Sequence, residues 1–160
     1  MDFENRLKQA IDRGKKRHEK RTQEAAEAAL SEEELKQLHS KYRLQLSEHI
    51  ESCVKLLPNH FPGFRFETIY GERGWGAACY RDDLKITAGK RDNVYSRLEM
   101  TIRPFSSYHV IDLAAKGAIL NKEAFNRNHF EKIVDVEPST FIDLIDAWVA
   151  EYAELYAFKQ

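Results

Sequence analysis

The hydrophobic residues of this chain change their spacing twice, and this change constrains the fold more than any other feature of the sequence. Residues 1–57 show helical spacing with many charges, residues 64–115 alternate apolar and polar side chains, and residues 140–158 return to helical spacing. Helices on either side of a run of closely connected strands are typical of an α+β domain. We therefore predict an antiparallel β-meander of about 4–6 strands, with an N-terminal and a C-terminal helix packed on one face.

Two amphipathic segments bracket the predicted strands. The first begins at Ser31, which with Glu34 gives the S-x-x-E pattern of a capping box, and it ends near Pro58. The second follows Pro138 and has the broadest apolar face in the chain. Its apolar residues recur at spacings of three and four: Phe141, Ile145, Trp148, Tyr152 and Leu155. A face this broad has to be buried, so we expect the C-terminal helix to lie across the sheet.

Turn residues divide the strand region. Five runs are predicted as strands: 64–70, 75–81, 84–88, 95–103 and 108–115. The intervening turns are predicted at residues 71–74, 82–83 and 89–93, where glycine, aspartate or asparagine is frequent. Residues 118–133 are ambiguous, because they fit either a short helix capped by Asn121 or an irregular edge segment.

Residues 1–30 are predicted to form a charged helical extension that is partly mobile, while residues 31–160 form a single α+β domain. The extension has few apolar side chains, but Phe3, Leu7 and Ile11 recur every four residues and form a narrow stripe. A helix as polar as this gains little from burial within its own fold. We therefore expect another protein, or a second copy of this chain, to cover the stripe.

The extension also carries a basic run with a possible affinity for phosphates. Its members are Arg13, Lys15, Lys16, Arg17, Lys20 and Arg21. Glu19 interrupts the run, so a solvated surface is the simpler interpretation. The net charge of −1 also gives the whole chain no general attraction to nucleic acid. Nucleic-acid binding is therefore the alternative hypothesis, and protein binding is the leading one.

The strand pattern predicts a polar outer face on the sheet. The side chains expected there are Arg65, Glu67, Arg97, Glu99, Thr101, Arg103, Tyr108 and Asp112. Mixed charges favour cross-strand ion pairs over an RNA-binding surface, which would present aromatic residues on a basic background. We predict that Arg97, Glu99, Arg103 and Tyr108 contribute to a partner-binding surface. A convergence of Arg97, Glu99 and Arg103 with His109 and Asp112 is a weaker alternative.

Motifs that carry chemistry are weak in this sequence. It lacks the G-x-S-x-G and H-E-x-x-H patterns, and the glycines of residues 71–76 fit a hairpin better than a phosphate loop. His49 and Cys53 lie four apart on a helix, a spacing that can place two ligands on one metal. No second pair of cysteine or histidine residues accompanies them, and both lie on or beside an apolar stripe. We therefore predict no catalytic residue, no metal site and no cofactor.

The remaining features of the sequence indicate the cellular compartment and the class of function. Cys53 and Cys79 lack a C-x-x-C spacing and are expected to be free thiols in a reducing compartment. The chain has no secretory signal pattern and no apolar run of about 18 residues, so we expect a cytoplasmic protein that does not bind membranes.

The order of elements resembles the general plan of small adaptor and chaperone-like folds, an architecture that serves many functions. We therefore expect a non-enzymatic interaction or assembly module. A small-molecule site or enzyme in the groove between sheet and C-terminal helix is the third hypothesis.

Overall fold

The structure, a computed structural model, describes residues 2–159, with the side chains of residues 26–31 outside the description. The chain divides into two compact units, residues 1–37 and residues 38–160. In chain order the elements are α1 (Phe3–Val54), α2 (Leu57–His60), β1 (Arg65–Ile69), β2 (Trp75–Thr87), β3 (Lys90–Ile102), β4 (Val110–Ile119), β5 (Lys122–Lys132), the 3-10 helix η1 (Ile133–Asp135) and α3 (Pro138–Lys159). The predicted boundary between residues 30 and 31, and the mobility of the extension, stay predictions.

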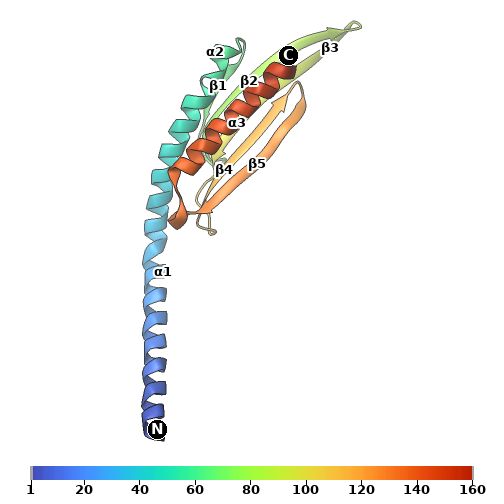
Figure 1. Cartoon of the computed structure of the whole chain (residues 1–160). Helices are drawn as coiled ribbons and strands as arrows, with labels where there is room; N and C mark the ends of the chain where they lie inside the picture. Colours follow the sequence, from blue (N-terminus) through green and yellow to red (C-terminus); the bar gives the residue numbers. More distant parts are fainter. Residues whose placement is uncertain (1, 160) are drawn as a thin grey trace. The chain divides into compact units, whose positions relative to one another are not determined.

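The second unit contains a five-stranded antiparallel sheet in the order β1-β2-β3-β4-β5 (Figure 1). Each strand therefore pairs with its neighbour in the sequence, as the short connections predict. In the register, Met100 of β3 lies between Ala77 of β2 and Ala115 of β4, so these three side chains share one face. The predicted α+β meander is confirmed.

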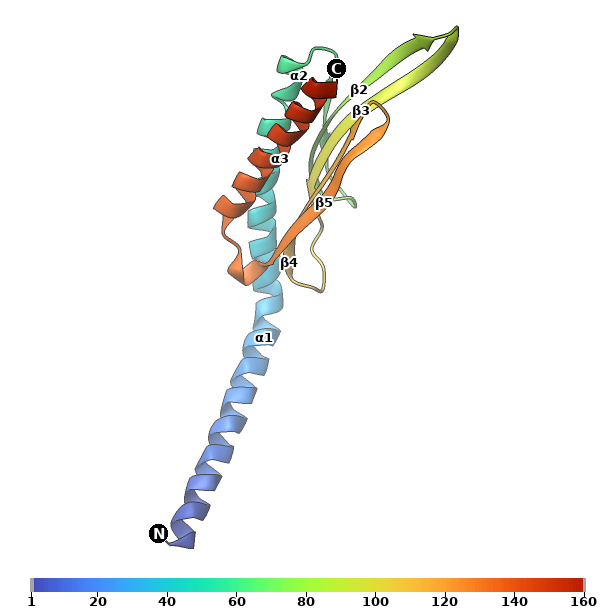
Figure 2. The same ribbon diagram turned by 45° about the vertical axis from the view of Figure 1, so that its right-hand side comes forward.

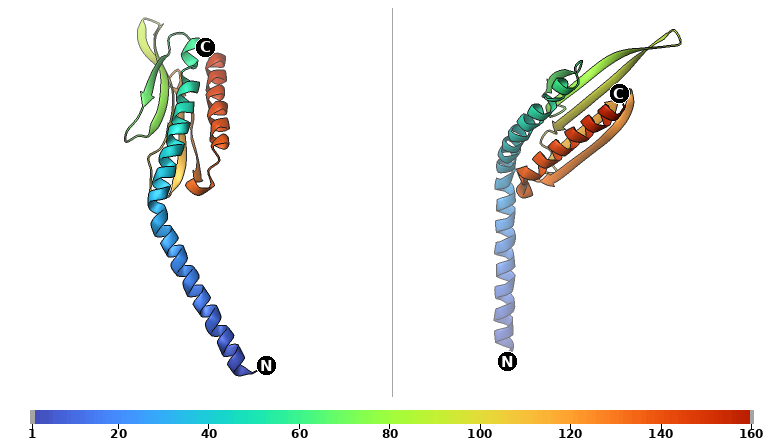
Figure 3. Two further views of the ribbon diagram at one scale, coloured as in Figure 1. Left: turned by 90° about the vertical axis from the view of Figure 1, so that its left-hand side faces the viewer. Right: turned by 45° about the horizontal axis from the view of Figure 1, so that its top comes forward.

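Two helices cover this inner face of the sheet. The part of α1 that belongs to the second unit and α3 lie side by side over the same face (Figures 2 and 3). From the helices, Leu46, Ile50, Phe141, Ile145 and Tyr152 are fully buried. The sheet contributes a second layer of fully buried side chains: Leu98, Met100, Ile102, Ile111 and Leu113. The prediction that both helices pack on one face is confirmed.

Helix α3 is hydrogen-bonded to the sheet at Tyr152. The hydroxyl of Tyr152 donates a hydrogen bond to the carbonyl oxygen of Ala118, at 2.9 Å. Gly117 lies next to this contact, and a Cβ added there would lie 3.1 Å from Tyr152 and 3.2 Å from Phe125. Glycine therefore leaves the room into which two aromatic rings pack. At about 25 cal/mol per Å² of apolar area, the aromatic face of α3 makes a large contribution to stability.

The predicted turn at residues 82–83 and the predicted loop at residues 89–93 are both wrong. Strand β2 runs through Asp82 and Asp83, which pair with Tyr95 and Val94 of β3. The actual turn consists of Ala88 and Gly89, with φ angles of 55° and 79°. Positive φ at both central residues is the conformation of a type I′ hairpin turn. Cross-strand pairing therefore overrides the turn preference of aspartate and makes one long hairpin.

The ambiguous residues 118–133 form most of a second hairpin. Strand β4 continues to Ile119, Leu120 and Asn121 form the turn with φ angles of 50° and 68°, and β5 follows as an edge strand. The helix capped by Asn121 is therefore excluded. The side chain of Asn121 instead accepts a hydrogen bond from the backbone amide of Tyr95, at 2.8 Å.

The predicted helix start at Ser31 is also wrong, because the backbone is helical from Phe3 through this position. Lysine, glutamate, arginine and alanine dominate residues 13–30, and all of them have high helix propensity. The side chain of Ser31, and with it the capping box, lies outside the described residues. Helix α1 ends at Val54, and Pro58 stands in the first turn of the short helix α2. Within residues 2–159 we find no helix that combines the length and the hydrophobicity needed to cross a bilayer.

Candidate functional site

The N-terminal part of α1 presents the predicted apolar stripe to solvent. We call residues 2–25 the arm and Phe3, Leu7 and Ile11 the arm stripe. Phe3 is 74% exposed, Leu7 47% and Ile11 48%. Every side chain of the arm is exposed, so this described segment builds no core of its own. Three large apolar side chains on one helix face are thus available to a partner.

The basic run lies on the same helix and is exposed throughout. Four of its residues recur at spacings of three and four and therefore share one face: Arg13, Lys16, Arg17 and Lys20. An α-helix has about 3.6 residues per turn, so the position in the sequence fixes where each side chain lies around the axis. The four basic side chains therefore centre on a different face of the helix from Phe3 and Leu7, which lie in its first two turns. The arm therefore offers an apolar surface near its start and a basic surface farther along.

The outer face of the sheet carries a network of ion pairs across three segments. Arg97 of β3 donates from Nη2 to Glu67 of β1, at 2.8 Å, and to Glu99, at 2.9 Å. Arg73, in the β1–β2 turn, donates to the same Glu99 oxygen, at 2.6 Å. Burial acts to raise the pKa of Glu99, but the hydrogen bond from Arg97 and the two arginine charges outweigh it and lower that pKa. Arg97 and Glu99, which the sequence predicts to bind a partner, are thus already engaged in ion pairs within the protein.

The other two residues predicted to bind a partner, Arg103 and Tyr108, lie near Asp112, and Arg103 also lines a hollow together with Arg73 and Glu99. Arg103 is 3.7 Å from a carboxylate oxygen of Asp112, whose other oxygen accepts a hydrogen bond from Asn128, at 3.2 Å. Tyr108 is 82% exposed and lines an open hollow of about 770 Å³ together with Asp112 and Phe130. The ring of His109 lies 5.6 Å from that of Phe105. The convergence of all these side chains on one catalytic point stays a prediction.

Side chains fill the interface between the sheet and α3. Phe141, Ile145 and Tyr152 are fully buried there, and Trp148 is 9% exposed. Arg127 of β5 closes one side, with its guanidinium 5.6 Å from the Trp148 ring and 2.7 Å from Glu151. This packing does not favour the hypothesis of a small-molecule site in that groove.

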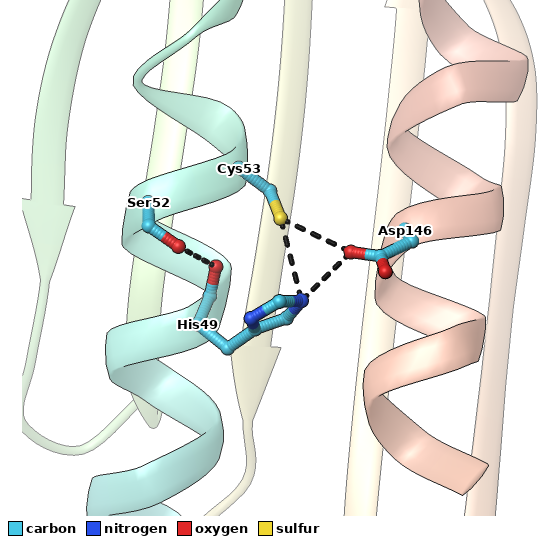
Figure 4. A network of polar contacts seen from close by, with 4 residues as sticks. All are labelled: His49, Ser52, Cys53 and Asp146. Atoms are coloured by element: carbon cyan, nitrogen blue, oxygen red, sulfur yellow. Dashed lines mark hydrogen bonds and ion pairs between the residues drawn. The ribbon is translucent and has the colours of Figure 1, made fainter. Parts of the chain in front are cut away.

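A third cluster joins α1 and α3 at their polar edge (Figure 4). Its members are His49 and Cys53, one turn apart on α1, and Asp146 on α3. His49 Nε2 lies 2.7 Å from Asp146 Oδ1, and Cys53 Sγ donates to the same oxygen at 3.3 Å. Cys53 Sγ and His49 Nε2 are 3.4 Å apart. The three potential ligand atoms thus lie within 4.8 Å of one another. We call this set the His–Cys–Asp cluster.

The electrostatics of the His–Cys–Asp cluster do not favour nucleophilic catalysis. Burial, followed by the nearby Asp146 carboxylate, raises the pKa of the Cys53 thiol to about 11. The hydrogen bond with His49 lowers the pKa of Asp146 despite its partial burial. The thiol is therefore neutral at neutral pH, whereas catalytic cysteines need a depressed pKa. In catalytic triads one ring nitrogen of the histidine contacts the nucleophile and the other contacts the carboxylate. Here the same nitrogen of His49, Nε2, faces both Cys53 and Asp146.

Sequence reasoning identified two members of this cluster and missed the third. The spacing of His49 and Cys53 fits a pair of metal ligands, although the sequence alone predicts no metal site, and Asp146 lies 93 residues beyond Cys53. No local pattern around Asp146 distinguishes it from the other acidic residues of α3. Only the packing of α3 beside α1 brings the three side chains together.

Scans of the chain against protein-family models, curated proteins and solved structures find no match.

Proposed function

We propose that this chain is a non-enzymatic interaction or assembly module that docks through its arm. The observation that carries the proposal is the exposure of Phe3, Leu7 and Ile11 on a helix without a core. Covering them would remove apolar area from water and so favour docking, most of all at Phe3, which is the most exposed of the three. Anchors at regular helical spacing are typical of a helix that binds in an apolar groove.

The outer sheet face is the weaker part of this proposal. Arg97 and Glu99 already have partners within the sheet, so a ligand would have to displace them. Tyr108, by contrast, is exposed beside the hollow at β4 and β5 and adds to the accessible apolar surface. The arm therefore supports the proposal more strongly than the sheet. A cytoplasmic location belongs to the proposal too, supported by the two free cysteines.

Nucleic-acid binding through the basic run is the second candidate. The observation in its favour is the single exposed face that carries Arg13, Lys16, Arg17 and Lys20. This face would contact phosphates, and binding would weaken steeply with added salt. It gives no role to Phe3, Leu7 and Ile11, which is why we prefer the protein-interaction proposal.

The direct test measures self-association of the full chain by sedimentation velocity over a wide range of protein concentration. We expect a concentration-dependent larger species that the triple variant F3A/L7A/I11A abolishes, because the variant removes most of the apolar area of the arm stripe. The matched control is N5A/Q9A, on the opposite side of the same helix, which should associate as the wild type does.

Two outcomes would contradict the proposal in this form. A wild-type chain that stays monomeric at every concentration excludes a second copy as the partner. Association that the arm-stripe variant leaves unchanged places the contact elsewhere in the chain. Binding of a DNA or RNA oligonucleotide with a steep salt dependence, lost when the basic run is neutralised, would favour the second candidate.

A further inference from the structure

We propose that the His–Cys–Asp cluster is a binding site for a divalent transition metal ion, with zinc as the best fit. The ligand atoms are His49 Nε2, Cys53 Sγ and Asp146 Oδ1, which come from two helices and face one another (Figure 4). This site is independent of the arm and of the function proposed for it.

The distances between the three atoms approach those of a tetrahedral zinc site. Zinc bonds of about 2.0–2.3 Å at tetrahedral angles place neighbouring ligand atoms about 3.4–3.6 Å apart. The two distances that involve Cys53 Sγ are 3.3 Å and 3.4 Å, so they already approach this spacing. The His49–Asp146 distance is 2.7 Å and has to open by about 0.7 Å. A rotation of the exposed Asp146 side chain can provide this opening.

The mixture of donor atoms selects the class of metal. One sulfur, one imidazole nitrogen and one carboxylate oxygen suit zinc and similar borderline ions. Magnesium and calcium prefer shells of oxygen and take no thiolate ligand. On binding, bonds form between the metal and both Cys53 Sγ and His49 Nε2; the thiol proton leaves to solvent, and the proton on Nε2 moves to Nδ1 or leaves to solvent. The charge of the ion then offsets the thiolate and the Asp146 carboxylate.

The surroundings leave room for a fourth ligand. Cys53 and Asp146 line a small hollow of about 220 Å³, together with apolar side chains that include Leu57 and Val149. A site with three protein ligands and an open position takes water or a small anion, whereas structural zinc sites use four protein ligands. His60 lines the same hollow.

The cluster also joins parts of the chain that are distant in sequence. His49 and Asp146 are 97 residues apart, and they belong to the two helices that cover the sheet. An ion bound to both helices would bind the folded state and not the unfolded chain. It would therefore stabilise the fold by an amount that grows with the logarithm of the ion concentration once this exceeds the dissociation constant.

The test uses the full chain without a histidine tag, kept reduced, and titrated with cobalt as a spectroscopic substitute for zinc. We expect a near-ultraviolet absorption band from sulfur-to-cobalt charge transfer that saturates at one ion per chain and disappears when zinc is added. C53S should lose this band, because Cys79 is fully buried in the sheet and cannot replace it. D146N and H49Q should weaken cobalt binding by about tenfold or more.

The matched control is D143N, which neutralises an exposed carboxylate on the preceding turn of α3 and should bind as the wild type does. As a second readout, zinc should raise the thermal midpoint of the wild type and of D143N, but not that of D146N. The Asp146 side chain is 54% exposed, so D146N should fold normally. No charge-transfer band in about a hundredfold excess of cobalt would overturn the proposal. So would a band that D146N and H49Q leave unchanged.

Discussion

Two residues in positive-φ turns show how single side chains define the hairpins of this fold. Asn121 has a φ of 68°, and its side chain bonds to the backbone of both Asn93 and Tyr95. Asparagine tolerates this conformation better than other residues with a Cβ. Ala88 has a φ of 55° in the other turn and gains no such compensation. Asn121 is therefore well matched to its position, whereas Ala88, like Leu120 beside Asn121, is not.

Replacing Ala88 by asparagine should stabilise the protein. The variant A88N creates the Asn-Gly pair that type I′ turns prefer, and we expect an increase of about 0.5–1 kcal/mol in the free energy of unfolding. Chemical denaturation measures this change. The opposite substitution, A88V, places a β-branched side chain at positive φ and should destabilise by a similar amount. If both variants shift stability in the same direction, the turn assignment is wrong.

At the scale of elements, the outer face of β1 and β3 is stabilised by a chain of charges rather than by apolar contacts. Arg97 links Glu67 to Glu99, and Arg73 adds a second positive charge at Glu99. Such pairs favour the ionised form of Glu99, whose pKa in the folded state is below 4.5 despite the opposing effect of burial. This network therefore links the stability of the sheet to pH.

The expected pH dependence follows from the direction of that shift. Because the pKa of Glu99 is lower in the folded state, its contribution to stability is complete above about pH 4.5 and is lost as the pH falls through the folded-state value. E99Q should therefore flatten the loss of stability below about pH 5. The measurement is the free energy of unfolding at neutral and acidic pH, with E154Q on the exposed side of α3 as the control. An unchanged slope in E99Q would show that this carboxylate does not contribute.

The sequence predicts the presence and type of a helix or strand better than it predicts the residues at which that helix or strand ends. The alternation at Leu98, Met100 and Ile102 identifies β3, because these positions are fully buried on one face. The turn at Ala88 is not predictable from local preference, since alanine rarely adopts positive φ and aspartate at 82–83 gives a stronger turn signal. Pairing across the hairpin decides the outcome there, and pairing is a property of two strands together. Pairing with β4 likewise determines that β5 is a strand, and the local sequence of β5 does not show this pairing.

At the scale of the whole molecule, the two units differ in how many of their described side chains are buried. The unit of residues 38–160 has a core of helices and sheet, with Leu46, Leu98 and Phe141 fully buried. The side chains of residues 2–25 are all exposed. The sequence predicts this difference from the density of apolar residues. It does not predict the His–Cys–Asp cluster, because no local pattern links Asp146 to His49.

Deleting residues 1–30 should leave the α+β unit folded. The free energy of unfolding should stay within about 0.5 kcal/mol of that of the full chain, because the deletion removes no side chain that the structure describes as buried. Self-association should be lost in the same variant. Circular dichroism and chemical denaturation test the first statement, and light scattering tests the second. A truncated chain that unfolds would show that the arm is needed for folding.

The position of α3 after all five strands has a consequence for how the molecule is made. A ribosome produces the complete meander before it produces Pro138–Lys159. Until then, Leu113 and the other inner-face side chains of β4, the strand that α3 contacts, face water or a chaperone. Translation products that stop short of Pro138 should therefore form inclusion bodies or be degraded, while products that include α3 escape both fates.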